Sequence, residues 1–196
     1  MMNRNIEHYA KKYKFLDKET CEKAMKELDT ISTGNNSEKE FIQHTFYNAR
    51  KNEYKPRSGS QELDMTYATI DTTKIVMDKL WNQLHQYMAD VGFPWFNSWD
   101  GYSKVRWNKY SENRKMALHV DHIKSLFEGE RKGVPVLSCL GVLNDDYEGG
   151  EFVMWDDKVI PFEQGDLLIF PSNFLYPHKV EPVTKGTRYS YISFVW

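Results

Sequence analysis

The sequence predicts a mainly β fold: a double-stranded β-helix (jelly roll, cupin-like) core with supporting α-helices on the N-terminal side. Two observations predict it. Before about residue 102, apolar residues recur with the helical period of about 3.6 residues. After it, the period changes towards about 2, and short runs rich in branched and aromatic residues follow one another between turn residues. Such short, closely spaced strands are typical of two packed antiparallel sheets.

The length of the chain sets the expected number of domains. With 196 residues and 23.2 kDa, we expect a single domain over residues 1–196. Within it, we expect residues 1–101 to form a mostly helical support region and residues 102–196 to form the jelly-roll core. Hydrophobic residues make up 40% and aromatic residues 15% of the chain, so a sizeable core can be built and wholesale disorder is excluded.

The charge of the chain argues against two classes of partner. A net charge of −2 and a pI near 6.3 give no overall attraction to nucleic acid or to anionic membranes. One local basic run comprises Lys104, Arg106, Lys109, Arg114 and Lys115. It is interpreted either as a solvated strand edge or as a rim that attracts anions.

Cysteine usage and the N-terminal residues indicate the compartment. Cys21 and Cys139 are too few for a disulfide framework and lie in apolar patterns, so we expect both to be buried as small hydrophobic residues. The first residues, MMNRNIEHYAKKYKF, lack the apolar core of a secretory signal, and no apolar stretch reaches the ~18 residues of a membrane span. These features predict a cytoplasmic protein without a membrane partner.

The first half predicts three helices and one loop. Asp17 is expected to cap a helix that runs to about residue 30, and the spacing of Ser37 and Glu40 indicates a second, shorter helix. Residues 48–62 are polar and predict a loop, either a surface connector or a lid over a substrate. Asp71 is expected to cap the longest helix, which Gly92 and Pro94 end.

The second half predicts about eight strands. Turn residues separate them, and Gly149-Gly150 is expected to close a hairpin. The predicted strands lie within residues 104–110, 116–122, 134–143, 151–155, 158–162, 166–170, 178–183 and 188–196.

Four polar residues within these strands form a pattern that indicates chemistry. His119 and Asp121 are two apart in a strand, so their side chains point to the same face. Such a pair is weak evidence alone, because a histidine on an apolar strand is more often a core residue. His178 and Arg188 begin two later strands. Two histidines and a carboxylate are the ligands of the facial triad that holds Fe(II). A buried arginine would need an anionic partner such as a dicarboxylate, with Ser190 on the same face as a hydroxyl donor.

Residues from about 102 to 196 resemble the 2-oxoglutarate- and Fe(II)-dependent dioxygenase superfamily, and within it the prolyl 4-hydroxylase branch most. The matching motifs occur in the order and near the spacing of the family. They are Tyr110; His119-Val120-Asp121; Leu143-Asn144-Asp145; Glu148-Gly149-Gly150-Glu151-Phe152; Pro161; Gly165-Asp166-Leu167-Leu168-Ile169-Phe170; Pro177-His178-Lys179-Val180; and Thr187-Arg188-Tyr189-Ser190.

This resemblance implies a function and a role for each matching residue. Fe(II) would be bound by His119, Asp121 and His178. The C5 carboxylate of 2-oxoglutarate would be bound by Arg188, with Ser190 and the Tyr110 hydroxyl. The implied catalytic residues are thus His119, Asp121, His178 and Arg188. The implied reaction consumes O₂ and 2-oxoglutarate, hydroxylates a C–H bond, and releases succinate and CO₂. A prolyl residue in a protein or peptide is the expected substrate.

Two positions depart from the pattern of the family. Met116 stands where many relatives carry an aromatic residue, and Val142 stands where some protein prolyl hydroxylases carry a tyrosine that contacts the co-substrate. We therefore expect the co-substrate pocket of this chain to differ in detail.

Other functions remain open on the sequence. The same scaffold could hydroxylate a free amino acid or another small molecule. Nucleic-acid demethylation is disfavoured, because that branch typically has a second arginine six residues after the first, where this chain has Phe194. A non-catalytic cupin-like binding protein is a further alternative. Zinc also suits the three ligands, but it would leave Arg188 unexplained. The sequence does not indicate an oligomeric state.

Overall fold

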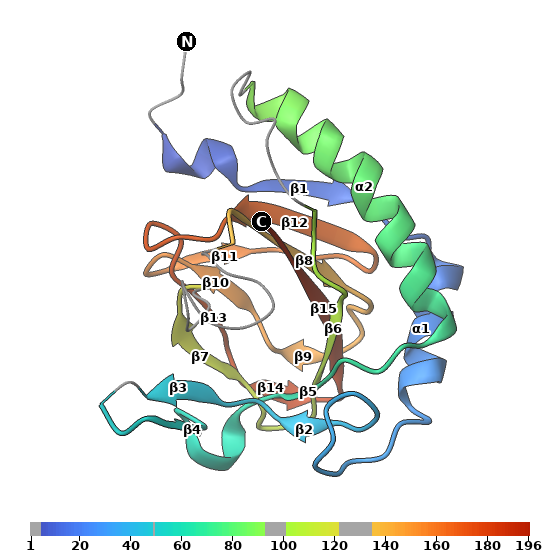
Figure 1. The fold of residues 1–196 in the computed structure, drawn as a ribbon, viewed down its shortest axis with the longest axis vertical. Coiled ribbons are helices and arrows are strands. Elements are labelled where there is room, and N and C mark those ends of the chain that lie inside the picture. The colour runs from blue at the N-terminus through green and yellow to red at the C-terminus, as the bar shows by residue number, and fades with distance from the viewer. Residues whose placement is uncertain (1–4, 49, 93–100, 122–134) are drawn as a thin grey trace.

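The computed structural model of the chain describes residues 5–48, 50–92, 101–121 and 135–196. The predicted fold class is confirmed: the described chain is mainly β, with antiparallel sheets and two α-helices (Figure 1). A seven-stranded sheet has the order β1-β12-β8-β15-β6-β5-β2, and a four-stranded sheet has the order β11-β10-β13-β7. These two sheets form the double-stranded β-helix.

Every predicted strand of the second half overlaps an observed strand, and the segment 178–183 contains β13 and the first residue of β14. The strands are β6 (Arg106–Tyr110), β7 (Met116–His119), β8 (Leu137–Val142), β9 (Glu148–Gly149), β10 (Phe152–Met154), β11 (Lys158–Ile160), β12 (Asp166–Pro171), β13 (His178–Val180), β14 (Val183–Lys185) and β15 (Arg188–Val195). Only β9 had no predicted counterpart. Its two residues pair with β14 and form a separate small sheet.

The strict alternation of side chains along the large sheet creates two hydrophobic cores. On β15, Tyr189 and Tyr191 point to one face, while Ser190 and Ile192 point to the other. The first face packs against the helices, and the second faces the four-stranded sheet. Residues that carry chemistry on this strand therefore lie between the two sheets.

Two helices cover the outer face of the large sheet, as Figure 1 shows. α1 (Lys18–Leu28) begins as expected, because the Asp17 side chain accepts a hydrogen bond from the Thr20 amide at 2.8 Å. α2 (Asp71–Val91) buries Val76, Leu80, Leu84 and Tyr87 in the same core. It ends at Gly92, whose left-handed φ of 65° suits a residue without a Cβ atom.

Three details of the helices differ from the predictions. Asp71 is the first residue of α2 rather than its cap, and Ile70 stands at the capping position. Residues 37–40 form a turn instead of a helix, because the Glu40 carboxylate accepts hydrogen bonds from the Asn35 and Asn36 amides and closes the loop on itself. Pro94 lies outside the described residues, as do the ends of two predicted strands at residues 122 and 134.

The first half also contributes strands that were not predicted. β1 (Lys11–Lys14) pairs with β12 at one edge of the large sheet. β5 (Asp64–Thr66) pairs with β6 at the other edge, and β2 (Ile42–Gln43) pairs with β5. A 3-10 helix, η1 (Ile6–Tyr9), precedes β1. These strands have two to four residues, which is too short for an apolar alternation to be recognised.

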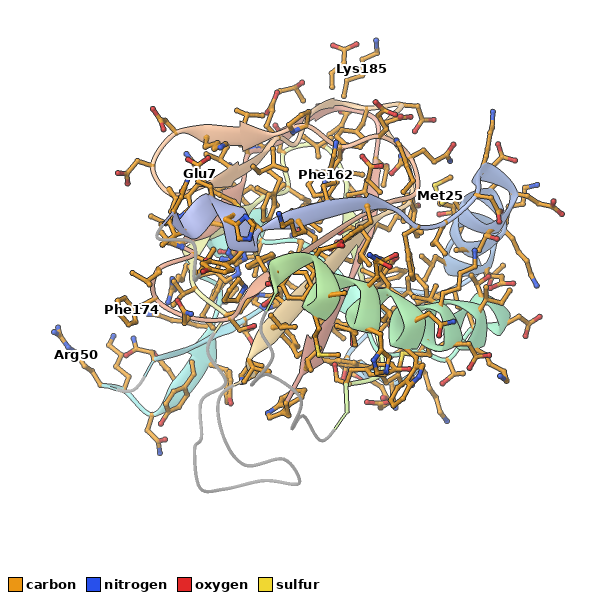
Figure 2. All side chains as sticks on the ribbon, turned by 90° about the horizontal axis from the view of Figure 1, so that it is seen from above. Glu7, Met25, Arg50, Phe162, Phe174 and Lys185 are labelled. Carbon is orange, nitrogen blue, oxygen red and sulfur yellow. The ribbon has the colours of Figure 1, made fainter. Side chains whose placement is uncertain are left out.

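The segment 48–62, expected as a loop, contains part of a hairpin and a helical turn. β3 (Phe46–Asn48) pairs with β4 (Glu53–Lys55), and η2 (Gly59–Gln61) follows. Tyr47 and Tyr54 pack across the two strands with ring centroids 5.3 Å apart. Figure 2 shows this hairpin extending from the body of the molecule, with Arg50 at its outer end.

The glycine pair at 149–150 does not close a hairpin. Gly149 belongs to β9, which pairs with β14, whereas the following strand β10 pairs with β11 and β13. Both glycines have positive φ values, 72° and 66°, and a Cβ atom on Gly149 would lie 2.4 Å from the Pro182 carbonyl oxygen. The pair thus turns the chain from one sheet to the other.

Cys21 and Cys139 are buried and free, as expected. None of the described helices has the length and apolar character that crossing a membrane requires. The expected cytoplasmic location and the single domain stay predictions.

Candidate metal centre and co-substrate pocket

The structure brings the two histidines and the aspartate of the sequence pattern together. His119 ends β7 and His178 begins β13, and the two residues are partners in the antiparallel pairing of these strands. Asp121 follows two residues after the end of β7. One potential ligand atom from each of the three residues lies within 4.8 Å of the others. The three side chains therefore converge on one point between the sheets.

Hydrogen bonds to the backbone fix the orientation of both imidazoles. Nδ1 of His119 lies 2.8 Å from the Ala117 carbonyl oxygen, and Nδ1 of His178 lies 3.0 Å from the Tyr176 carbonyl oxygen. A carbonyl oxygen only accepts, so each Nδ1 carries the proton and donates it. Each Nε2 then has a free lone pair, which is the form that binds a metal ion.

A chain of two serines holds the carboxylate of Asp121. The Ser138 hydroxyl donates to Asp121 Oδ2 at 2.6 Å, and the Ser172 hydroxyl lies 2.5 Å from that of Ser138. Since Ser138 already donates to Asp121, Ser172 donates to Ser138. Both serines are buried, so bulk water does not compete for the hydrogen bonds that hold the carboxylate.

The electrostatics of the cluster favour the protonation states that bind a metal. Burial would raise the pKa of Asp121, but His178, His119 and the Ser138 hydroxyl outweigh it and lower that pKa below its usual value. Burial and the neighbouring His119 lower the pKa of His178 from 6.5 to about 4, against the opposing effect of Asp121. At neutral pH the site thus presents a carboxylate and a neutral His178 imidazole.

Arg188 lies in the same inter-sheet space, at the start of β15 and opposite Tyr110 of β6. Its side chain is fully buried. Nη1 donates to the Ser190 hydroxyl at 3.0 Å, and Nε donates to the Tyr147 hydroxyl at 3.2 Å. The guanidinium carbon lies 4.9 Å from the centre of the Tyr110 ring. Tyr110 and Ser190, both named from the sequence, therefore do surround Arg188.

The guanidinium has capacity left for an anion. Nη2 of Arg188 is buried and has no hydrogen-bond partner, and no carboxylate pairs with the guanidinium, within the part of the chain that the structure describes. A buried cation without a counter-charge is costly. A dicarboxylate would supply both the missing charge and the missing acceptor.

Sequence reasoning missed four residues that support the site. Ser138 and Ser172 hold Asp121, and Tyr147 contacts Arg188. Asn144 accepts from the Tyr189 amide and donates to the Thr187 carbonyl, so it fixes the backbone on both sides of Arg188. Asn144 was part of the quoted motif, but neither spacing nor residue type assigns these roles.

A cavity of about 830 Å³ opens in front of the cluster, and His119 and Asp121 are among the residues that line it. Its wall also includes Met116, one of the two positions that depart from the pattern of the family, and Phe194, which stands where the demethylase branch has its second arginine. Arg188, Ser190 and Tyr110 do not line it. The proposed ligands His119 and Asp121 thus line the open cavity, whereas the buried Arg188 does not.

Comparisons with known proteins agree with this arrangement. The family model described as "2OG-Fe(II) oxygenase superfamily" matches residues 105–196. A PKHD-type hydroxylase from Xylella fastidiosa (strain M12) is 38% identical over 101 residues, which cover 46% of this chain and 42% of that protein. The chain thus spans less than half the length of this curated relative.

Two solved structures share the fold. One is the viral collagen prolyl hydroxylase from Paramecium Bursaria Chlorella virus-1, with a TM-score of 0.64, 13% identity, and coverage of 95% of this chain and 94% of that chain. Another is a prolyl hydroxylase from Trichoplax adhaerens in complex with a hypoxia inducible factor peptide fragment, with a TM-score of 0.67, 15% identity, and coverage of 96% and 84%. At these identities the likeness concerns the fold alone.

The donor set of the structure fits the two groups that the name of this family specifies. Two imidazoles and one carboxylate suit Fe(II), and the unpartnered Nη2 of Arg188 suits the distal carboxylate of 2-oxoglutarate. Residues 105–196 match the 2OG-Fe(II) oxygenase superfamily, and the chain shares its fold with prolyl hydroxylases.

Proposed function

We propose that the chain is a 2-oxoglutarate-dependent Fe(II) dioxygenase that hydroxylates an unactivated C–H bond. In this proposal His119, Asp121 and His178 bind Fe(II), and Arg188 binds the C5 carboxylate of 2-oxoglutarate. The observation that carries it is the convergence of three ligand atoms within 4.8 Å, together with a buried arginine whose Nη2 has no partner among the described residues.

When bound, iron and 2-oxoglutarate supply the oxidation: one oxygen atom of O₂ enters the substrate, and the other enters the succinate that forms as CO₂ leaves. The protein supplies the positions. The Ala117 and Tyr176 carbonyls hold the two imidazoles with Nε2 free, and Ser138 and Ser172 hold the carboxylate. Such supporting contacts orient metal ligands and raise their affinity for the metal.

Aromatic side chains keep water away from one side of the proposed centre. The rings of Phe152 and Phe170 lie 5.2 Å and 5.1 Å from the His178 ring, centroid to centroid. All three side chains are buried. An apolar wall of this kind strengthens electrostatic contacts inside the site and protects reactive species from side reactions.

For the co-substrate pocket, we propose three supporting groups around Arg188. Ser190 and Tyr147 are already within hydrogen-bond distance of the guanidinium and fix its plane. The Tyr110 ring lies against the guanidinium. We propose that the Tyr110 hydroxyl donates a hydrogen bond to the C5 carboxylate of 2-oxoglutarate, beside Arg188 and Ser190. Burial raises the pKa of Tyr110, so this hydroxyl keeps its proton.

We further propose that the substrate is a prolyl residue in a protein or peptide. Support comes from the PKHD-type hydroxylase that the chain resembles and from the neighbouring fold that was solved with a peptide fragment. Hydroxylation of a free amino acid on the same scaffold is the alternative, because loops rather than the fold determine the substrate.

Succinate formation tests the proposal. The protein is incubated with Fe(II), 2-oxoglutarate, O₂ and a panel of proline-containing peptides and free amino acids. We expect succinate together with a product heavier by one oxygen atom, and neither in the His178→Ala variant. If only free amino acids gave a product, the substrate would be a free amino acid, and the proposal of a prolyl residue in a protein or peptide would be wrong. Absence of succinate with every substrate, in a protein that also fails to bind Fe(II), would refute the enzyme itself.

A further inference from the structure

The cavity in front of the proposed metal centre carries an excess of positive charge. Its described lining includes three cations, Arg57, Lys104 and Arg106, and one acid, Asp121. Asp121 is a proposed metal ligand, and Lys104 pairs with Glu38 at 3.6 Å. Two arginines therefore face the cavity without a counter-charge among the residues that the structure describes.

Arg106 is directed towards this space by the alternation of β6. Along the strand, Arg106, Asn108 and Tyr110 share one face, and Trp107 packs into the core on the other face, against the helices. Arg106 Nε donates to Asn108 Oδ1 at 3.0 Å. This bond orients the guanidinium but leaves its two terminal nitrogens available. Arg106 thus stands on the same strand face as Tyr110, in the open cavity rather than in the closed pocket of Arg188.

Arg57 reaches the cavity from the other side. It follows β4, and its Nη1 donates to the Leu118 carbonyl oxygen at 2.8 Å. Its guanidinium carbon lies 4.3 Å from the centre of the Phe46 ring, and that ring contacts the ring of His119 with centroids 5.6 Å apart. The charge of Arg57 is therefore held close to the proposed metal ligands by two contacts that do not neutralise it.

A buried histidine in the same wall also lacks a partner. His44 lines the cavity and is only 8% exposed, and its Nδ1 has no hydrogen-bond partner in the described part of the chain. Burial, with added effects from Arg106 and His119, lowers its pKa from 6.5 to about 2, so the imidazole is neutral. A neutral buried nitrogen without a protein partner can form a hydrogen bond with one polar group of a ligand.

We propose that Arg106 and Arg57 bind a carboxylate of the substrate, so that the oxidised molecule is an acidic one. This inference rests on the proposed function, because it concerns the substrate of that same site. A bound carboxylate would neutralise two cations that otherwise face the cavity unpaired, and guanidinium groups bind carboxylates with short, charge-assisted hydrogen bonds. The carboxylate belongs either to an acidic residue beside the reacting one or to a free amino acid.

Calorimetric binding tests the proposal without turnover. The protein is kept under nitrogen with Mn(II) in place of Fe(II) and saturating 2-oxoglutarate. Two matched pairs of probes are titrated: acetyl-Ala-Ala-Pro-Glu-Ala-Ala-amide against its Pro-Gln counterpart, and proline against prolinamide. We expect the carboxylate-bearing member of at least one pair to bind about tenfold more tightly or better. The pair that shows this preference identifies the source of the carboxylate.

Variants assign the preference to the two arginines. Arg106→Gln or Arg57→Gln should reduce the ratio of the two affinities, and the double variant should bring it close to one. Arg106→Lys, which keeps the charge, should retain part of the preference. Lys55→Gln is the matched control: Lys55 lies on the same hairpin, is exposed and does not line the cavity, so the ratio should not change.

The proposal is overturned if neither acidic probe binds more tightly than its neutral counterpart, whether through equal affinity or through no binding at all. It is also overturned if the double variant keeps the preference. Failure of the proposed function is a separate result, because Mn(II) and 2-oxoglutarate are titrated before any probe and would then give no binding signal.

Discussion

His119 and His178 face each other as register partners on the neighbouring antiparallel strands β7 and β13, with ring centroids 4.3 Å apart. Directly opposed residues of two antiparallel strands have closely spaced Cβ atoms. The strand pairing itself therefore brings together two imidazoles from distant parts of the sequence, and Asp121 reaches them from the end of β7. The predictions below test how the surrounding residues support this arrangement.

The first prediction concerns the serine that holds the carboxylate. Ser138→Ala removes the hydroxyl that donates to Asp121 Oδ2 at 2.6 Å. Loss of a supporting hydrogen bond to a metal ligand typically costs about 10- to 100-fold in metal affinity. We expect an Fe(II) affinity lowered by about that factor in a folded protein, measured by anaerobic titration.

Ser193→Ala is the matched control for this change. Ser193 is equally buried on the adjacent strand, but it donates to the Ser103 carbonyl oxygen rather than to a proposed ligand. Equal losses of Fe(II) affinity in the two variants would show that the effect arises from disturbed packing and not from the contact with Asp121.

The second prediction concerns Tyr147, which the sequence did not indicate. Tyr147→Phe removes the oxygen that accepts from Arg188 Nε at 3.2 Å. The hydrogen bond that orients the guanidinium is expected to contribute on the order of 1 kcal/mol to the free energy of 2-oxoglutarate binding. We expect the dissociation constant for 2-oxoglutarate to rise by about 3- to 10-fold, with Fe(II) affinity unchanged. Unchanged 2-oxoglutarate affinity would mean that Ser190 alone orients the guanidinium.

The third prediction concerns the dependence of stability on pH. The pKa of His44 is about 2 in the folded protein, because of burial, and about 6.5 when unfolded. Between these values the unfolded chain binds one more proton, so the free energy of unfolding falls as pH decreases from about 6.5. The contribution of His44 is about 1.4 kcal/mol per pH unit. His44→Gln should remove this contribution from the slope of the free energy of unfolding against pH, measured by urea unfolding from pH 7 to pH 5.

His85→Gln is the control for the pH experiment, because His85 is exposed on α2. Its substitution should leave the slope of stability against pH as in the wild type. If His44→Gln also leaves the slope unchanged, His44 is not held neutral in the folded protein.

The fourth prediction concerns a buried glutamate beside β7. Glu62 is fully buried, and its carboxylate accepts from the Ser58 amide at 2.9 Å, the Ser58 hydroxyl at 2.7 Å and the Ala117 amide at 3.4 Å. Glu62→Ala would leave these donors without a partner, at a cost of about 1–3 kcal/mol. We expect that loss in urea unfolding, whereas Glu53→Ala, an exposed position on β4, should change stability little.

Much of the fold was predictable because period and turn residues persist through the second half. Each predicted strand overlaps an observed one, and α1 and α2 were found from their apolar stripes. The strands of the first half could not be predicted from the sequence. β1, β2 and β5 gain their stability from pairing with the edges of a sheet that other segments build. Their own residues carry no local signal strong enough to show it.

The proposed site was predictable to the extent that its members share a motif. His119, Asp121, His178 and Arg188 stand at recognisable spacings, and the structure brings the first three together. Ser138, Ser172 and Tyr147 could not be found, because a serine inside an apolar strand or a tyrosine in a turn has no distinctive spacing. Their contacts depend on the tertiary fold.

Arg106 illustrates the same limit. In the sequence it belongs to a basic run that could be a solvated edge or an anion-attracting rim. The structure divides that run: Lys109 pairs with Asp29, Arg114 pairs with Asp64, and Arg106 lines the cavity. The alternation of side chains along β6 determines which basic residues face the cavity. The sequence alone does not show which face of the strand is directed inwards.

The most direct test of the central claim is an anaerobic titration of Fe(II) into the wild-type protein and into three variants, His119→Ala, Asp121→Ala and His178→Ala. The account predicts one Fe(II) per wild-type chain and no binding to any of the variants at the same concentrations. A wild-type protein that takes up no Fe(II), or variants that bind it as tightly as the wild type, would contradict the account.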